Sequence, residues 1–270
     1  MAMITITERE FSQFQRLIYD IAGIKMADSK KPLVSGRLAK RLAHYGVKSY
    51  GDYFRILQND QSSTELQVAI DLLTTNETYF FRESKHFDFI KSQVLPNRDA
   101  NRPFRVWSAA CSSGEEAYTL AMVNTDVLGY NNWEILASDI SSRMLEKAGK
   151  GHYTLASTRG MTQDYLSRYC LKGVGRQDGT FLIESKLRQR IKFMQVNLNE
   201  SLPRIGEFDM IFLRNVMIYF DKETKSQVIS RILSVLRPGG YLMVSHSESL
   251  HGMTDQLSIV KPSVYQKTYA

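Results

Sequence analysis

The sequence has few of the residues that hold metals or form disulfide bonds. Among its 270 residues only Cys111 and Cys170 are cysteines, too few for a disulfide framework or a cysteine-rich zinc site. No stretch approaches the roughly 20 consecutive apolar residues that span a bilayer, and residues 1–10 lack the long apolar segment of a secretory signal. These absences predict a cytoplasmic protein in a reducing compartment, with no metal cofactor.

Acidic residues are also in short supply. The chain has 35 lysines and arginines against 28 aspartates and glutamates, a net charge of +7. Its composition is otherwise typical of a folded globular protein, with 43% hydrophobic and 11% aromatic residues. The excess of positive charge therefore favours an anionic substrate or partner.

The first third of the chain has a helical pattern. Apolar residues from Phe11 to Ile21 recur at three- and four-residue spacing, and Gly23 is expected to end this helix. Further helices are expected after Pro32 and over residues 50–59 and 63–73. We therefore predict an N-terminal all-helical domain with its linker over residues 1–95.

The pattern changes after the turn-forming residues between 96 and 103. Short β-rich runs now alternate with helical segments, and this order predicts a parallel sheet flanked by helices. The expected strands are residues 104–108, 134–138, 191–197, 208–213 and 241–245. An α/β domain is therefore predicted over residues 96–270.

One segment interrupts this order. Residues 159–192 combine a short helix, a glycine-rich turn and a strand-like run, too much chain for a plain loop in a compact domain. The segment contains eight basic and three acidic residues. It is predicted to be a small inserted β-subdomain, either an interaction surface or a hairpin that only covers a sheet edge.

A strand that begins near Val106 leads into small residues and then a helix. Small residues let a ligand approach the backbone, and the helix N-terminus offers free N–H groups. The only glycine of the turn is Gly114, a poor match to a dinucleotide fingerprint, and Glu115 and Glu116 would repel a pyrophosphate. The pattern favours a phosphate-free, positively charged cofactor such as S-adenosylmethionine, with an ordinary tight turn as the alternative.

Polar residues follow three other predicted strands. Asp139 lies where a carboxylate would bind ribose hydroxyls, or it caps the helix that begins at Ser141. Asn197 either caps a turn or binds an adenine edge, and Arg214 and Asn215 follow a buried strand. Since ligands of such sheets bind at the carboxyl ends of the strands, these residues are expected on one rim.

A basic surface is expected in the helical domain. Residues 25–48 contain seven basic residues and one acid. At about 100° per residue, basic side chains occupy one helix face, separate from an apolar stripe that includes Val34, Leu38 and Leu42. The basic face comprises Arg37, Lys40, Arg41, His44 and Lys48. It suits an acidic partner helix, although a merely solvated charged face is the alternative.

Five segments of the sequence resemble the CheR-type chemotaxis receptor methyltransferases: residues 75–82, 107–116, 137–140, 214–220 and 236–242. The resemblance covers nearly the whole chain, and the first and fourth of these segments are specific to that family. It implies the class I methyltransferase fold, with a Rossmann-like doubly wound sheet. It also implies methyl transfer from S-adenosylmethionine to glutamates on the cytoplasmic methylation helices of chemoreceptors, with S-adenosylhomocysteine as the product.

The resemblance also implies roles for single residues. Arg82 and Tyr219 would lie beside the reacting methyl group. The cofactor would contact Asn76, Thr78, Arg82, Glu115 or Glu116, Asp139, Asn197, Leu198, Arg214 and Asn215. The receptor helices would dock on Arg37, Lys40, Arg41 and His44. Some family members bind a C-terminal receptor peptide with the inserted subdomain and others do not, and this sequence does not decide between them.

Two other functions stay open. A nucleic-acid methyltransferase would suit the positive charge, but the sequence lacks an Asn/Asp-Pro-Pro-Tyr/Phe motif, and its basic face lacks interleaved aromatic residues for base stacking. A catalytically inactive adaptor that binds receptors is the second. The lack of an obvious exposed apolar helix favours a monomer.

Overall fold

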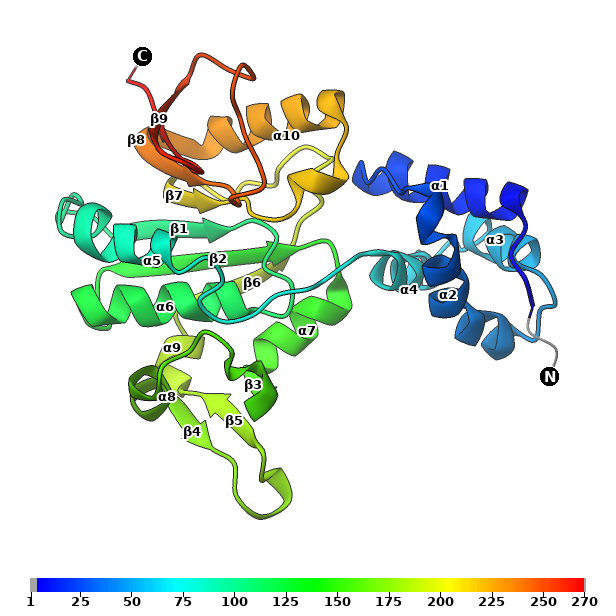
Figure 1. Cartoon of the computed structure of the whole chain (residues 1–270), viewed down its shortest axis with the longest axis horizontal. Coiled ribbons are helices and arrows are strands. Elements are labelled where there is room, and N and C mark those ends of the chain that lie inside the picture. The colour runs from blue at the N-terminus through cyan, green and yellow to red at the C-terminus, as the bar shows by residue number, and fades with distance from the viewer. Residues whose placement is uncertain (1–3, 270) are drawn as a thin grey trace.

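The computed structural model describes residues 4–269, and four helices at the N-terminal end form a bundle beside an α/β unit (Figure 1). The bundle helices are α1 (Glu8–Ala22), α2 (Lys31–Tyr45), α3 (Tyr50–Gln58) and α4 (Thr64–Leu73). Helix α1 begins with a capping box between Thr7 and Glu10 and ends at Gly23, which has the left-handed φ of 69°. The four predicted helices are therefore confirmed, including the residue that ends the first.

The main sheet has seven strands in the order β6-β2-β1-β7-β8-β10-β9. The strands are β1 (Phe104–Ser108), β2 (Trp133–Asp139), β6 (Ile191–Gln195), β7 (Phe208–Phe212), β8 (Leu236–Met243), β9 (Leu257–Lys261) and β10 (Val264–Lys267). The first five in the spatial order are parallel, as predicted. Strands β9 and β10, which add an antiparallel edge, are not among the predicted strands.

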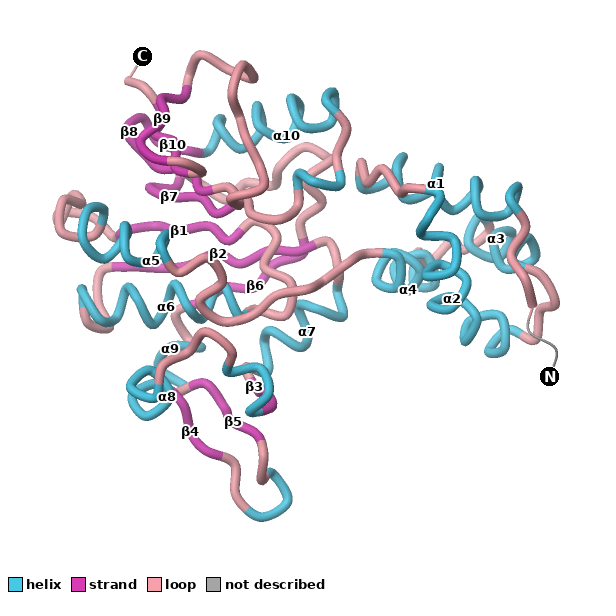
Figure 2. The backbone as a smooth tube through the Cα atoms, viewed as in Figure 1, coloured by secondary structure: helices cyan, strands magenta, loops and turns pink. Residues whose placement is uncertain are grey.

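Helices cover both faces of this sheet (Figure 2). They are α5 (Lys85–Phe89), which continues as a π-helix (Ile90–Val94), α6 (Glu115–Leu128), α7 (Ser142–Lys150) and α10 (Lys222–Val235). One buried cluster contains Ile90 and Leu120, whereas Val228 and Ile232 of α10 belong to a second cluster with Trp107. Because a core lies on each face of the sheet, the central strands are apolar on both faces, and consecutive residues are buried.

The packing places the boundary between the two units earlier than predicted. Phe80, Phe87, Ile90 and Leu95 all lie in the core of the α/β unit, whereas the core of the bundle ends at Leu73. The chain therefore divides near Leu73 and not at residue 95. The error arose because α5 has a helical pattern, which does not reveal which core it packs against.

A small three-stranded antiparallel sheet projects from the α/β unit (Figure 1). Its order is β3-β5-β4, from β3 (His152–Thr154), β4 (Cys170–Lys172) and β5 (Thr180–Ile183), with the short helices α8 (Gln163–Tyr169) and α9 (Ser185–Arg188). The predicted insertion is present, but it begins at His152 and ends before β6. Its first strand was missed because it is only three residues long.

Hydrogen bonds join the bundle to the α/β unit. The Lys25 N–H donates to the Tyr219 carbonyl at 2.7 Å, and the Tyr19 hydroxyl donates to Asp221 at 2.7 Å. On the other side of the junction the Ser142 hydroxyl donates to Asp71 at 2.9 Å. Between Ile4 and Tyr269 no helix combines the length and the apolar character needed to cross a membrane.

Candidate cofactor and acceptor site

A cavity of about 310 Å³ lies between the bundle and the carboxyl ends of the sheet strands. Its sheet side is formed by residues that follow β1, β2, β6 and β7. The direction in which the chain adds strands to the sheet reverses at β1, which has β2 on one side and β7 on the other. That is where open α/β sheets bind ligands. The opposite side comes from the end of α1, the turn before α2, and the linker after α4. Of the expected cofactor and catalytic residues, the cavity is lined by Asn76, Thr78, Arg82, Glu116, Asp139, Asn197, Leu198, Arg214, Asn215 and Tyr219.

The loop after β1 leaves room for a ligand because its residues are small. Ala109, Ala110 and Ser112 line the cavity. Gly114 has a φ of 96°, and a Cβ atom there would lie 2.8 Å from the Cβ of Ala148. Glycine is therefore required for both the backbone conformation and the close packing against α7.

The Asp139 carboxylate is held by two backbone N–H groups. Ser112 donates to one oxygen at 2.8 Å and Ser141 to the other at 2.9 Å. Burial raises the pKa of Asp139, although these donors oppose the shift. The cap of α7 is the Ser141 side chain, so Asp139 is not the N-cap. Its remaining lone pairs can accept hydrogen bonds from a ligand in the cavity.

The two consecutive glutamates at the start of α6 have different surroundings. Glu116 lines the cavity, and it accepts hydrogen bonds from Ser108 at 2.7 Å and from Arg214 at 3.0 Å. Glu115 accepts from Ser113 at 2.7 Å and does not line the cavity. Burial raises the pKa of both carboxyl groups. Glu116 is therefore the cofactor candidate of the pair, and Glu115 is not.

Arg214 joins the sheet to the linker. Its side chain is only 2% exposed and makes ion pairs with Glu116 at 3.0 Å and Glu83 at 3.2 Å. The same guanidinium donates to the Arg82 carbonyl at 2.5 Å. A buried arginine with this many fixed acceptors acts as a brace, so Arg214 positions the linker in addition to lining the cavity.

Asn215 is held in place by a residue that the sequence analysis missed. It has a φ of 57°, and its N–H donates to Glu248 at 3.0 Å. The buried Glu248 carboxylate also accepts from the backbone of Ile218 at 3.2 Å and of Ser245 at 2.9 Å. Its position shortly after β8, at the same sheet edge as the other polar residues, is the signal that could have identified it.

The Asn197 side chain caps a turn and contacts the bundle. Its amide nitrogen donates to the Ile21 carbonyl and to Glu200, both at 2.8 Å, and its oxygen accepts from Asn199 at 3.0 Å. The structure therefore contains the turn-capping role, and because Asn197 also lines the cavity, contact with an adenine edge stays a prediction. Leu198 contributes an apolar surface to the cavity.

The linker lies across the cavity between the bundle and α5. Its Asn76 carbonyl accepts from the Ser112 hydroxyl at 2.9 Å. The Arg82 guanidinium donates to the Glu77 carbonyl at 2.9 Å and lies over the Tyr79 ring, 5.6 Å from its centre. Since Tyr219 also lines the cavity, the fold brings together the two residues that were expected to act on the reacting groups.

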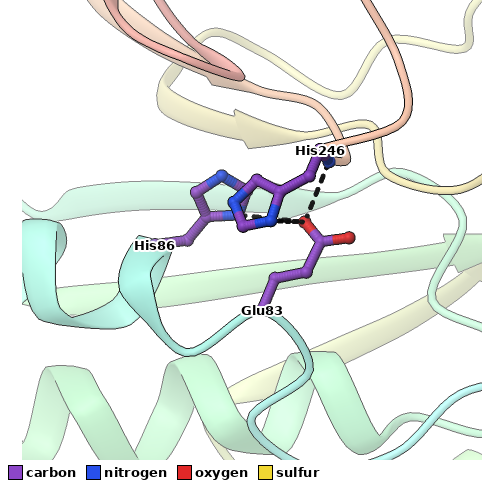
Figure 3. Close-up of side chains that lie close together, drawn as sticks. All are labelled: Glu83, His86 and His246. Carbon is purple, nitrogen blue, oxygen red and sulfur yellow. Dashed lines mark hydrogen bonds and ion pairs between the residues drawn. The ribbon is translucent and has the colours of Figure 1, made fainter.

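Glu83, His86 and His246 form the cluster in the described part of the chain that offers three ligand atoms to a metal ion (Figure 3). The Nδ1 atoms of His86 and His246 lie 3.7 and 4.0 Å from the Glu83 carboxylate. That carboxylate already pairs with Arg214, and the backbone N–H of His246 donates a hydrogen bond to it at 3.2 Å. We interpret the cluster as a support for the linker, because an added cation would lie beside the Arg214 charge.

The predicted basic face of α2 is divided by the fold. Arg37 donates to the carbonyls of Leu72 and Thr74 at 3.0 and 2.8 Å, and Arg41 makes a two-point ion pair with Glu65. Lys40 and His44 are the exposed members of this face within α2, and Lys48, which is also exposed, lies beyond the end of the helix at Tyr45. The expectation of one continuous exposed ridge is therefore wrong for the two arginines, because the end of α4 and its buried acid lie within their reach.

Comparisons with known proteins agree with this arrangement. The family model for the CheR methyltransferase SAM binding domain matches residues 76–266, and that for the CheR methyltransferase all-alpha domain matches residues 9–74. The chemotaxis protein methyltransferase of Salmonella typhimurium is 38% identical over 97% of this chain and 91% of its own length. Those of Escherichia coli and Borreliella burgdorferi are 37% and 36% identical, and the alignments cover 97% and 98% of this chain and 92% and 96% of the relatives. The chain belongs to the CheR methyltransferase family.

Proposed function

We propose that this protein transfers a methyl group from S-adenosylmethionine to glutamate side chains on the cytoplasmic helices of chemoreceptors. One observation carries the proposal: a single cavity lies between the two domains of the family and is lined by Arg82 from the linker and Tyr219 from the sheet edge. The relatives named above are chemotaxis protein methyltransferases, which supports the class of substrate. We further propose that the protein acts in the cytoplasm as a monomer.

The side chains that line the cavity fit S-adenosylmethionine. Asp139 provides acceptor lone pairs for hydroxyl groups, and Glu116 provides negative charge for a cationic group. A volume of about 310 Å³ lies at the lower end of the range for small-molecule sites. We assign Asn76, Thr78, Arg82, Leu198, Arg214 and Asn215 to the cofactor surface on the same basis. Asn197 holds the Leu198 loop, and no metal is assigned to the reaction.

The reaction needs no general base. A free glutamate has a pKa of about 4.3, so its carboxylate is already ionised at neutral pH. S-adenosylmethionine supplies a methyl group on a positively charged sulfur, so that the carboxylate oxygen forms a bond to the methyl carbon while the carbon–sulfur bond breaks and its electron pair stays on sulfur. The task left to the protein is to exclude water and to align the groups.

Arg82 is suited to orient the acceptor. It lines the cavity, and the only hydrogen bond that its guanidinium makes in residues 4–269 uses one nitrogen, which leaves donors for a carboxylate. Tyr219 is fixed through its backbone by the Lys25 N–H and presents a half-buried ring to the cavity. We propose that Arg82 holds the acceptor carboxylate and that the Tyr219 side chain helps to exclude water beside it.

The acceptor helices are proposed to dock on the exposed face of α2. Lys40 and His44 lie on this face, whereas Arg37 and Arg41 hold its inner side. The two arginines would therefore support the receptor surface from within the bundle. A receptor C-terminal peptide at the small antiparallel sheet stays a further proposal.

The experiment is to incubate the protein with tritiated methyl donor and receptor-containing membranes. We expect label that alkali releases as methanol, because a methyl ester hydrolyses under conditions that leave N-methyl groups intact. Arg82→Gln should lower kcat by about 100-fold, the scale found when an oriented donor is lost at a reacting centre, whereas the Arg82→Lys control should retain part of the activity. The affinity for S-adenosylhomocysteine, measured by calorimetry, should change less than kcat in both variants.

Two results would contradict the proposal. Label on RNA or DNA in place of receptors would indicate the nucleic-acid methyltransferase. Binding of receptor and S-adenosylhomocysteine without any transfer would indicate the inactive adaptor.

A further inference from the structure

The Tyr79 ring carries two guanidinium groups and no carboxylate. The guanidinium carbon of Arg82 lies 5.6 Å from the centre of this ring, and that of Arg159 lies 5.1 Å from it. Arg82 belongs to the linker, whereas Arg159 is the first residue after the turn that follows β3 in the small antiparallel domain. Two segments about 80 residues apart in sequence therefore bring like charges to one aromatic ring at the cavity rim.

Neither guanidinium is neutralised. In residues 4–269, Arg82 and Arg159 make no ion pair, and Arg159 makes no side-chain hydrogen bond. Four of the other arginines that lie over an aromatic ring in residues 4–269 also pair with an acid: Arg41, Arg105, Arg168 and Arg214. Arg190, over Trp133, makes no ion pair, but its guanidinium donates a hydrogen bond to Asn131.

The position of Arg159 is fixed by its neighbour. Gly160 has a φ of 85°, and a Cβ atom there would lie 2.4 Å from the Phe80 carbonyl oxygen. The loop thus packs directly on the linker next to Tyr79. Tyr79 and Arg82 line the cavity, and Arg159 is exposed beside them. Glu77, two residues before Tyr79, is exposed and also lines the cavity, but its carboxylate pairs with neither arginine, and Glu83, next to Arg82, pairs with Arg214.

We propose that Tyr79, Arg82 and Arg159 form a subsite for two carboxylates of one acceptor segment, in which Arg159 binds an acidic side chain near the glutamate that is methylated. This inference rests on the proposed function, since it takes Arg82 as the partner of the reacting carboxylate. A guanidinium with free donors binds carboxylates through paired hydrogen bonds. A helix presents residues three or four apart on one face, with Cβ atoms about 5–6 Å apart, so that one helix can offer two carboxylates to neighbouring side chains. Arg159 would thereby select acceptors by their acidic neighbours.

The test compares two helical acceptor peptides that differ only beside the methylated glutamate. One carries glutamate three and four residues away on either side, and the other carries glutamine there. We expect Arg159→Gln to raise KM for the acidic peptide about 3- to 5-fold, the scale of one exposed charge pair, with kcat and the affinity for S-adenosylhomocysteine unchanged. For the glutamine peptide the same variant should behave as the wild type does. Arg159→Lys should restore part of the lost affinity.

Arg176→Gln is the matched control, because Arg176 is exposed in the same small domain and the charge change is identical. It should alter neither peptide's KM. An equal rise in KM for both peptides, or no rise for the acidic one, would overturn the subsite. A wild-type enzyme that methylates neither peptide nor receptor membranes would overturn the proposed function and this inference with it, whereas failure of the subsite alone would leave receptor methylation intact.

Discussion

The two sides of the cavity hold their charges in different ways. On the sheet side, Asp139, Glu116 and Arg214 are largely buried, and each is fixed by partners within the protein. On the helical and linker side, Lys25 and Arg82 line the cavity without an acidic partner among residues 4–269. The charges on one side are therefore held by partners within the protein, and the other side retains unpaired positive charge.

This difference separates the two ligands of the proposed reaction. A small cofactor is the same in every turnover, so a fixed set of buried acceptors serves it well. An acceptor helix arrives from outside, and unpaired cations at the rim attract it and orient its carboxylates. The contrast suggests that substitutions on the sheet side will affect stability and cofactor binding, whereas those on the helical side will affect the acceptor.

The largest effect is expected for Arg214→Met. The change leaves the buried Glu116 without its positive partner, and breaking one side of a buried ion pair costs about 3–5 kcal/mol of unfolding free energy. Urea unfolding would measure the loss. The control Arg16→Met removes an ion pair with Asp20 from a side chain that is 85% exposed, and it should cost less than about 0.5 kcal/mol.

A second variant separates charge from packing at the same place. Glu116→Gln added to Arg214→Met removes one of the two carboxylate charges that lose their partner, the other being that of Glu83, so the double variant should recover part of the lost stability. If Arg214→Met costs less than about 1 kcal/mol, the sheet side is not fixed by its buried charges, and the comparison of the two sides would not hold.

The sequence predicted most of the rim but not how its charges are paired. Asp139 and Arg214 could be placed because strand ends are recognisable from β-rich runs, and the carboxyl ends of parallel strands share one edge. The partition between Glu115 and Glu116 could not be predicted. Both belong to the first turn of α6, and only the direction of each side chain separates them.

The basic face of α2 shows the same limit. Helical periodicity correctly placed Arg37, Lys40 and Arg41 on one side, yet it gave no information on Glu65, which lies 24 residues away from Arg41 and faces it. Sequence patterns report the period of one helix, whereas a pairing between two helices depends on how they pack. For the same reason the domain boundary, which lies near Leu73, was predicted too late, at residue 95.

A smaller effect, on the pH dependence of stability, is expected at the junction of the two sides. Burial, and after it the positive charge of Arg214, lower the pKa of His86 to about 3. The unfolded chain takes up a proton on this ring below about pH 6.5, whereas the folded protein does not. The unfolding free energy should therefore fall as the pH drops from 7.5 to 5.5, by about 1 kcal/mol from this residue alone.

The measurement is the difference between wild type and His86→Gln over that pH range. Other groups titrate in both proteins and cancel, so the difference should shrink by about 1 kcal/mol towards pH 5.5. A constant difference for His86→Gln would mean that the ring has the same pKa in the folded and the unfolded protein, and that burial does not lower it.

The smallest effect is expected on the outer face of the bundle, at the exposed Lys40. Lys40→Glu should raise KM for the acceptor about 3-fold, and the rise should be smaller in high salt. Stability and the affinity for S-adenosylhomocysteine should not change, because Lys40 makes no ion pair among the described residues. Lys192→Glu on the exposed edge of β6 makes the same charge change and should leave KM unaltered. Arg41→Met should instead destabilise the protein through Glu65. Equal effects of Lys40→Glu and Lys192→Glu would mean that net charge attracts the acceptor, and that α2 is not its docking face.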